Sequence, residues 1–435
     1  MQVLWQLRLA SLFTDIRSFL GPGLDQVVVS GTNFALTIIL AHQLGAEKFG
    51  VWAALWIGVY LAGAFHDALI VTPLQVFTYE KARRGEQNYL GAMMTIQLGF
   101  LLVVSAFALL VFFVANLISL FSVDLSTIAA TLCLINSYLA SECYRKIFFI
   151  QQRSAQALVL DCIRFGILLA AVLVYFALGA PGDDLKIIVW IVALANVCGV
   201  LFGWAVLRCA SCGDRAYVEQ VARESWNYSR WLVALEISQR AGLDLVYAIA
   251  GWVLGIAALG ALRAFSQILG ILNLYLAVLN NILPPAMSRR LADEGPARLA
   301  GDLVRLLALS AILGGVLIVL TSVDPKSLVT ILLGQDFAPY APSLPVMAVG
   351  YVAFLLSYPV KGTLLAFRDS RGMAIANFAG AGVSVVLAYP LTIWMGAVGA
   401  ALAFSLYFMV EAIGFALAAR RCFAQTRRVN GALTV

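Results

Sequence analysis

Three ionisable residues stand four positions apart in one apolar stretch of the chain: Glu236, Arg240 and Asp244. In a helix this spacing places an acid, a base and a second acid along one face. An ionisable side chain in the hydrocarbon of a membrane costs about 2.5 to 3.5 kcal/mol, which makes each of them a functional candidate. Two interpretations stay open: a site that binds a substrate or a cation, or a self-neutralised group that only needs to face protein.

Two more cations lie in neighbouring apolar stretches. Arg263 has no acid within one turn of it and is followed four residues later by Gln267. Lys361 lies near the end of its stretch, where its long side chain can also reach the membrane surface. We predict a hydrated cavity in which Arg240, Arg263 and Lys361 attract an anionic group.

The first half of the chain has fewer polar residues of this kind. Asp25 lies early in the first apolar stretch, and Asn33 follows about two turns later. The predicted substrate contacts are Arg240, Arg263, Gln267, Lys361 and Asn33. The candidates for coupling to H+ or Na+ are Glu236, Asp244 and Asp25.

Two other charged groups are interpreted as structural. Asp161 and Arg164 are three residues apart and can pair on one helix. Glu142, Arg145 and Lys146 form a charge cluster near the end of a predicted span.

The seven cysteines are scattered along the chain. Cys209 and Cys212 have the spacing of half a zinc or redox motif, but no second pair or nearby histidine completes it. We therefore predict no metal, no cofactor and no catalytic residue.

The composition shows which elements must position these residues. The 435 residues are 62% hydrophobic and only 12% charged, whereas soluble domains carry about 25% charged residues. Because lipid offers no hydrogen-bond partners to the backbone, each crossing must be a helix of roughly 20 residues. The sequence predicts an all-α polytopic membrane protein in an inner or plasma membrane. No cleavable signal peptide is expected in residues 1–20, which carry charges among their apolar residues.

We predict twelve spans from the apolar windows. They cover roughly residues 21–43, 49–73, 92–119, 125–148, 157–179, 187–207, 230–253, 257–287, 303–323, 340–365, 374–394 and 396–418. With a cytoplasmic N-terminus, the inner segments hold 22 Lys and Arg residues and the outer loops hold three. This asymmetry supports the span count and predicts that both termini are cytoplasmic. The basic residues serve topology, so no nucleic-acid partner is expected.

An internal repeat organises the spans. Leu44-Gly45-Ala46-Glu47-Lys48-Phe49-Gly50 returns 210 residues later as Leu254-Gly255-Ile256-Ala257-Ala258-Leu259-Gly260. Duplication of this kind is typical of transporters, and six spans per half predict parallel repeats. The predicted parts are an interfacial amphipathic helix (1–20), an N-terminal lobe (21–207), a cytoplasmic linker (208–229), a C-terminal lobe (230–418) and a basic cytoplasmic tail (419–435).

The stretch Ser30–Ala35, followed by Leu40–Gly50, resembles the opening of bacterial polysaccharide flippases of the MOP superfamily. The stretch Ile331–Phe337 resembles a second part of those proteins. The resemblance implies two six-helix lobes forming a V. It implies transfer of undecaprenyl-diphosphate-linked sugar units to the outer leaflet, for O-antigen or exopolysaccharide assembly with a polymerase and export machinery. Related lipid II flippases contact the diphosphate with arginines from spans one, two and eight. Arg263 fits the span-eight position, but spans one and two offer no arginine here.

Alternatives to a flippase remain. A multidrug and cation antiporter of the same superfamily would share the fold, although its cavity should be mainly acidic. A sugar transporter of the major facilitator type has twelve spans, but its Gly- and Arg-rich signature is absent after the second span. A polysaccharide polymerase or ligase, which would be an enzyme, commonly has a large outer loop, and the outer loops predicted here are short.

Overall fold

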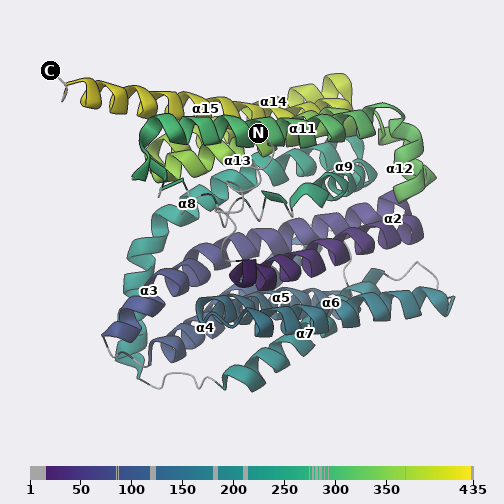
Figure 1. Cartoon of the computed structure of the whole chain (residues 1–435). Coiled ribbons are helices and arrows are strands. Elements are labelled where there is room, and N and C mark those ends of the chain that lie inside the picture. The colour runs from purple at the N-terminus through teal and green to yellow at the C-terminus, as the bar shows by residue number, and fades with distance from the viewer. Residues whose placement is uncertain are drawn as a thin grey trace. The chain divides into compact units, whose positions relative to one another are not determined.

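The computed structural model describes residues 16–84, 86, 88–117, 124–179, 185–208, 214–273, 275–276, 279, 283, 287–288, 290–291, 293–367 and 369–432. Every element in these residues is a helix (Figure 1). The α-helices are α2 (Ile16–His66), α3 (Thr72–Arg83), α4 (Tyr89–Leu117), α5 (Leu125–Ile150), α6 (Ser154–Ala177), α7 (Leu185–Leu207), α8 (Arg215–Leu254), α9 (Ile256–Leu269), α11 (Gly295–Ser322), α12 (Pro325–Leu333), α13 (Ser343–Ala366), α14 (Ser370–Met395) and α15 (Ala397–Ala432). A π-helical turn η1 (Asp67–Val71) and 3-10 turns η2 (Gly270–Leu272) and η3 (Gln335–Tyr340) lie between them.

The helices coincide with the predicted spans. Among the described residues, eight helical stretches are long and apolar enough to cross a membrane. The first of them, Gly23–Lys81, holds the first two predicted windows. Three more windows fall on α5, α8 and α9, which are shorter or more polar than the rest. Part of the eighth window, 257–287, lies outside the described residues.

The flanking segments are more helical than predicted. Residues 1–15 of the predicted interfacial helix lie outside the description, and α2 is already helical from Ile16. The predicted linker 208–229 enters α8 at Arg215, so its described C-terminal part continues into the seventh span. The predicted tail continues α15 as far as Ala432.

The chain divides into two compact units. Unit 1 comprises Met1–Ala54 with Ser238–Val435, and unit 2 comprises Leu55–Ile237. These units follow contact density and not the sequence repeat, so the lobe boundaries 21–207 and 230–418 stay a prediction.

In unit 1, the two copies of the repeated motif contact each other. Gly45 breaks α2 with a φ of 70°, and its repeat partner Gly255 separates α8 from α9 with a φ of 96°. Only glycine adopts such angles without strain. One turn later, a Cβ on Gly260 would lie 2.8 Å from the carbonyl oxygen of Ala46. A Cβ on Gly50 would in turn overlap the carbonyl of Ile256.

This contact is reciprocal, because Ala46 and Ile256 are themselves 210 residues apart, as are Gly50 and Gly260. The repeat predicted from sequence is therefore visible in the structure as a close crossing of two helices. Small residues at the crossing let the two backbones touch.

A second set of contacts holds the kink of α2 against the α12 to η3 segment of unit 1. The imidazole Nε2 of His42 lies 3.1 Å from the carbonyl oxygen of Ile331. The ring of Phe49 packs edge-on against that of Phe337, with centroids 5.9 Å apart, and Phe337 is fully buried. The segments that carried the family resemblance thus lie side by side.

In unit 2, buried ion pairs join α5, α6 and α7. The guanidinium of Arg164 lies 2.9 Å from Glu142 and 3.1 Å from Asp161, and its Nε donates to Asn196 at 3.0 Å. Arg145 contacts the other oxygen of Asp161 at 2.7 Å. The predicted pairing of Asp161 with Arg164 is confirmed. The network also draws in Glu142 and Arg145, which sequence spacing alone had placed in a separate cluster.

A second ionic group in unit 2 ties the start of α8 to the end of α3. Lys81 is buried and contacts Glu86 at 3.2 Å and Glu224 at 2.8 Å, while the Tyr217 hydroxyl donates to Glu86 at 2.7 Å. These contacts lower the pKa of both carboxyl groups, chiefly through the Tyr217 hydrogen bond at Glu86 and the Lys81 hydrogen bond at Glu224. The residues before the seventh span are therefore firmly attached to unit 2.

Candidate functional site

The side chain of Asp244 lies between two guanidinium groups. Arg240 Nη1 is 3.9 Å from Asp244 Oδ2, and Arg263 Nη1 is 3.6 Å from Asp244 Oδ1. Arg240 and Asp244 meet because they are one turn apart on α8, whereas Arg263 comes from α9, past the break at Gly255. The three side chains together carry a net positive charge, and we call them the Asp244 cluster.

The exposure of these side chains differs. Asp244 is 10% exposed, Arg263 14% and Arg240 34%, so Arg240 is the most accessible member. Both ion-pair distances exceed those of short charge-assisted hydrogen bonds. A stronger anionic partner can therefore compete for the guanidinium groups.

Aromatic packing and backbone contacts position Arg263. Its guanidinium carbon lies 5.3 Å from the ring centre of buried Tyr247, a cation–π arrangement. The Ser266 hydroxyl donates to the Arg263 carbonyl at 2.7 Å, and the Tyr351 hydroxyl donates to the Ser266 carbonyl at 2.9 Å. These bonds connect α9 to α13 next to Arg263, so the helix that carries this arginine is held in place.

A row of buried and half-buried aromatic rings leads from Tyr247 to α13. Tyr247 packs on Phe404 with ring centres 5.7 Å apart, and Phe404 packs on Phe408 at 5.1 Å. Phe408 lies 4.6 Å from Phe354, which lies 5.1 Å from Tyr358. Each end of this aromatic row carries a cation.

The cation at the far end is Lys361, whose ammonium lies 5.5 Å from the ring centre of Tyr358. Lys361 also interacts electrostatically with Glu411 of α15, a carboxylate that is 8% exposed. Sequence reasoning missed Glu411, although it is an acid within the twelfth predicted window, between long apolar runs. It also missed the aromatic row, because the rings come from α8, α13 and α15 and their spacing on one helix does not reveal the contact.

The remaining predicted residues occupy other positions. Asp25 is buried and Asn33 half-buried on α2, and the Asn33 carbonyl accepts a hydrogen bond from Thr37. Gln267 is half-buried one turn after Arg263 on α9, and Glu236 is half-buried one turn before Arg240 on α8. The ion pairs of the Asp244 cluster unite three of the eight predicted site residues.

A metal centre does not emerge from the geometry. Over the ranges that the structure describes, no three His, Cys, Asp or Glu side chains come together in a way that could hold a metal ion. The chemistry available at the Asp244 cluster is the binding of anions by guanidinium groups and of protons or cations by a carboxylate.

No protein-family model matches the chain, and no curated protein matches it. Solved structures match it in fold. The inward-facing conformation of a multidrug resistance MATE family transporter of the MOP superfamily gives a TM-score of 0.74 at 10% identity, over 94% of this chain and 99% of that chain. An outward-facing conformation of such a transporter gives 0.64 at 11% identity, over 95% and 96%. Lipid II flippase MurJ in an inward closed conformation gives 0.67 at 12% identity, over 95% and 90%.

These matches extend over nearly the whole length of each chain, so they concern the complete architecture and not one helical fragment. At sequence identities of 10% to 12%, these matches establish the fold and leave the substrate open. The predicted fold class is confirmed: the chain is an all-α polytopic membrane protein, and its internal repeat is visible in the structure. The chain has the fold of the MOP superfamily transporters.

Proposed function

We propose that the chain is a flippase for oligosaccharide units linked to undecaprenyl diphosphate, moving them from the cytoplasmic to the outer leaflet of a bacterial inner membrane by alternating access. The observation that carries this proposal is the Asp244 cluster, in which two arginines share one carboxylate. A diphosphate that crosses hydrocarbon needs its charge compensated. The planar guanidinium group suits phosphate oxygens because it can donate two parallel hydrogen bonds.

The proposed mechanism starts from competition for the arginines. A diphosphate bears more negative charge than the single carboxylate of Asp244, so it draws Arg240 and Arg263 toward itself. Asp244 then loses its cationic partners and becomes free to take up H+ or Na+, which links substrate binding to a coupling ion. Glu236 and Asp25 are further candidates for that ion, and Asn33, Gln267 and Lys361 are candidates for contact with the sugar or the diphosphate.

The match to lipid II flippase MurJ supports this proposal, since that protein is a flippase for a lipid-linked substrate. The proposal places both termini in the cytoplasm. It places the product at the outer surface, where a polysaccharide polymerase and export machinery would use it for O-antigen or exopolysaccharide assembly.

A second candidate is a cation-coupled multidrug antiporter, and the aromatic row favours it. The aromatic rings near the carboxylates Asp244 and Glu411 offer the surfaces that bind organic cations. The fold match to MATE transporters supports this candidate equally. The two functions differ in the sign of the charge that the site must accept.

Deletion of the gene in its native host distinguishes them. A flippase predicts loss of one surface polysaccharide and accumulation of its lipid-linked unit, with drug susceptibility unchanged. An antiporter predicts unchanged surface glycan and increased susceptibility to cationic drugs. That second result would overturn the flippase proposal.

A further inference from the structure

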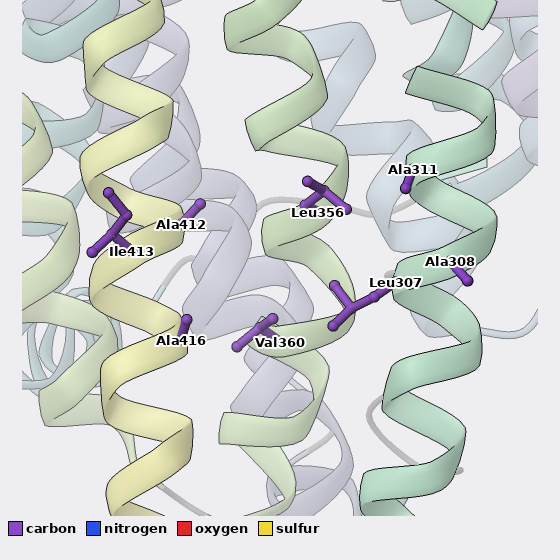
Figure 2. A pocket seen from close by; sticks show the side chains of 8 residues that line it. All are labelled: Leu307, Ala308, Ala311, Leu356, Val360, Ala412, Ile413 and Ala416. Atoms are coloured by element: carbon purple, nitrogen blue, oxygen red, sulfur yellow. The ribbon is translucent and has the colours of Figure 1, made fainter. Parts of the chain in front are cut away.

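Two cavities of similar size lie at matching places in the two halves of the chain. One, of about 560 Å³, lies between α4, α5 and α7 in unit 2, and the other, of about 530 Å³, lies between α11, α13 and α15 in unit 1 (Figure 2). Seven of the eight residues that line the second cavity follow a residue of the first by 210 or 216 positions. The pairs 210 apart are Gln97 and Leu307, Leu98 and Ala308, and Leu101 and Ala311. The two cavities therefore occupy equivalent positions in the repeat.

Their linings differ in one decisive respect. All the side chains that line the second cavity are aliphatic, as the carbon-only sticks of Figure 2 show. The first cavity has Gln97 at the position of Leu307, together with the polar residues Asn136 and Ser137. The equivalent cavity shows that this place in the fold needs no amide for packing, so Gln97 calls for another explanation.

The Gln97 side chain is 4% exposed and is only half satisfied. Its Oε1 lies 2.8 Å from the Nε2 of buried His66, whereas its Nε2 has no hydrogen-bond partner within the described part of the chain. Exchanging the amide oxygen and nitrogen leaves the same problem, because His66 engages one end and the other end stays unpaired. An unpaired buried amide costs about 1 to 3 kcal/mol in hydrogen-bond desolvation unless a ligand completes it.

The cavity has an exposed apolar edge. Leu98 and Trp204 line it and are 56% and 61% exposed, as expected of apolar side chains that face lipid. Asn136, by contrast, is satisfied within the protein, because its Nδ2 lies 2.8 Å from the Ser105 hydroxyl and 2.7 Å from the Leu132 carbonyl. The lining of the cavity thus combines apolar side chains, exposed residues at its edge and one buried amide group that lacks a hydrogen-bond partner.

We propose that this cavity binds the acyl chain of a membrane glycerolipid, whose ester carbonyl accepts a hydrogen bond from Gln97 Nε2. The volume suits one ligand of this size. Gln97 lies eight residues into α4, about 12 Å from the start of that helix at Tyr89. A lipid with its headgroup at that end of the helix brings its ester group close to Gln97, whereas a polyprenyl chain carries no carbonyl along its length.

The test compares two photoreactive lipids in liposomes of phosphatidylethanolamine and phosphatidylglycerol that contain the full chain. One probe is phosphatidylethanolamine with ester-linked chains and a diazirine on one chain, and the other is its ether-linked analogue, which lacks the carbonyl. After irradiation, the label is quantified on peptides from α4, α5 and α7. We expect the ester probe to label these peptides about threefold to tenfold more strongly, which corresponds to one hydrogen bond.

Two reciprocal variants sharpen the test. Gln97→Leu introduces the residue of the equivalent cavity and should abolish the preference for the ester probe. Leu307→Gln should create such a preference in peptides from α11 and α13. The ether probe acts on the unaltered protein, so the comparison survives if Gln97→Leu does not fold.

Equal labelling by the two probes in the unaltered protein, or an unchanged ester preference in Gln97→Leu, would contradict the proposal. A photoreactive polyprenyl phosphate that labels the same helices more strongly than the glycerolipid would also overturn it, and would assign the cavity to a substrate tail.

Discussion

The close contact between Gly50 and Gly260 predicts that Gly260→Ala destabilises the crossing of the two helices. The added Cβ would lie 2.7 Å from the Gly50 nitrogen and 2.8 Å from the Ala46 oxygen, closer than carbon atoms tolerate. Both obstacles are backbone atoms, so they cannot move aside as a flexible side chain does. Overpacking of this kind costs about 1 to 3 kcal/mol.

We expect this contact in only one of the two states of the proposed alternating access. The free-energy cost of the added Cβ should therefore shift the equilibrium toward the other state. A free-energy change of about 1.4 kcal/mol corresponds to a tenfold change in an equilibrium constant. Gly260→Ala should therefore lower the population of the state with the closed contact roughly fivefold to a hundredfold relative to the other state. The reporter is Ala46→Cys in a background without native cysteines, because Ala46 is 5% exposed in the closed contact. Its labelling by a membrane-impermeant maleimide should accelerate accordingly.

The matched control is Gly315→Ala on α11 in the same unit, where a Cβ meets nothing within 4 Å. It should leave the labelling rate unchanged, since alanine in open space favours a helix. The reciprocal variant Gly50→Ala should behave like Gly260→Ala. If both contact variants label as slowly as the control, the crossing does not restrain the protein and the reasoning fails.

Two further predictions concern unit 2. Arg164→Leu removes one of two arginines that pair with the carboxylates of Glu142 and Asp161, and it should cost about 3 to 5 kcal/mol, seen as a markedly lower unfolding temperature in detergent. Exposed Arg223→Ala should change this temperature little, and equal effects of the two variants would refute the buried network. The pKa of the Glu224 carboxyl group is lowered in the folded protein, mainly by its hydrogen bond to Lys81. The ionised carboxylate therefore stabilises the fold above its unfolded pKa near 4.5, and this contribution is lost as the pH falls through the lower folded pKa. Cleavage of this region by an acid-active protease should rise below about pH 4.5 in the native chain, and a Glu224→Gln variant that shows the same pH dependence would contradict this.

The periodicity and composition of the chain were sufficient for the architecture. A run of about 20 apolar residues has only one stable form in lipid, so the windows coincide with helices even where boundaries shift. The recurrence of Gly45 and Gly255 had a simple physical cause, since both positions need a positive φ where one helix gives way to another. A repeat of this kind can be recognised in a single sequence because both copies require a glycine at the same position.

The site was only partly predictable. The pairing of Arg240 with Asp244 follows from one-turn spacing on α8, but the approach of Arg263 to the same carboxylate depends on the break at Gly255 and the packing of α9. Contacts between helices, such as Lys361 with Glu411 and the aromatic row, leave no periodic trace in one sequence. The sequence alone does not single out the Gln97 amide. Its significance follows from the comparison with the equivalent cavity, where Leu307 occupies the same position.

The central claim is that the arginines of the Asp244 cluster bind a lipid diphosphate during transport. The most direct measurement is the flipping of a fluorescent polyprenyl-diphosphate sugar in proteoliposomes, comparing Arg263→Ala with Arg263→Lys and with the exposed control Arg223→Ala. We predict loss of flipping by at least about tenfold in Arg263→Ala, since a charged hydrogen bond contributes about 1.5 to 3 kcal/mol, with partial recovery in Arg263→Lys and full activity in the control. Undiminished flipping by a folded Arg263→Ala protein would contradict the claim.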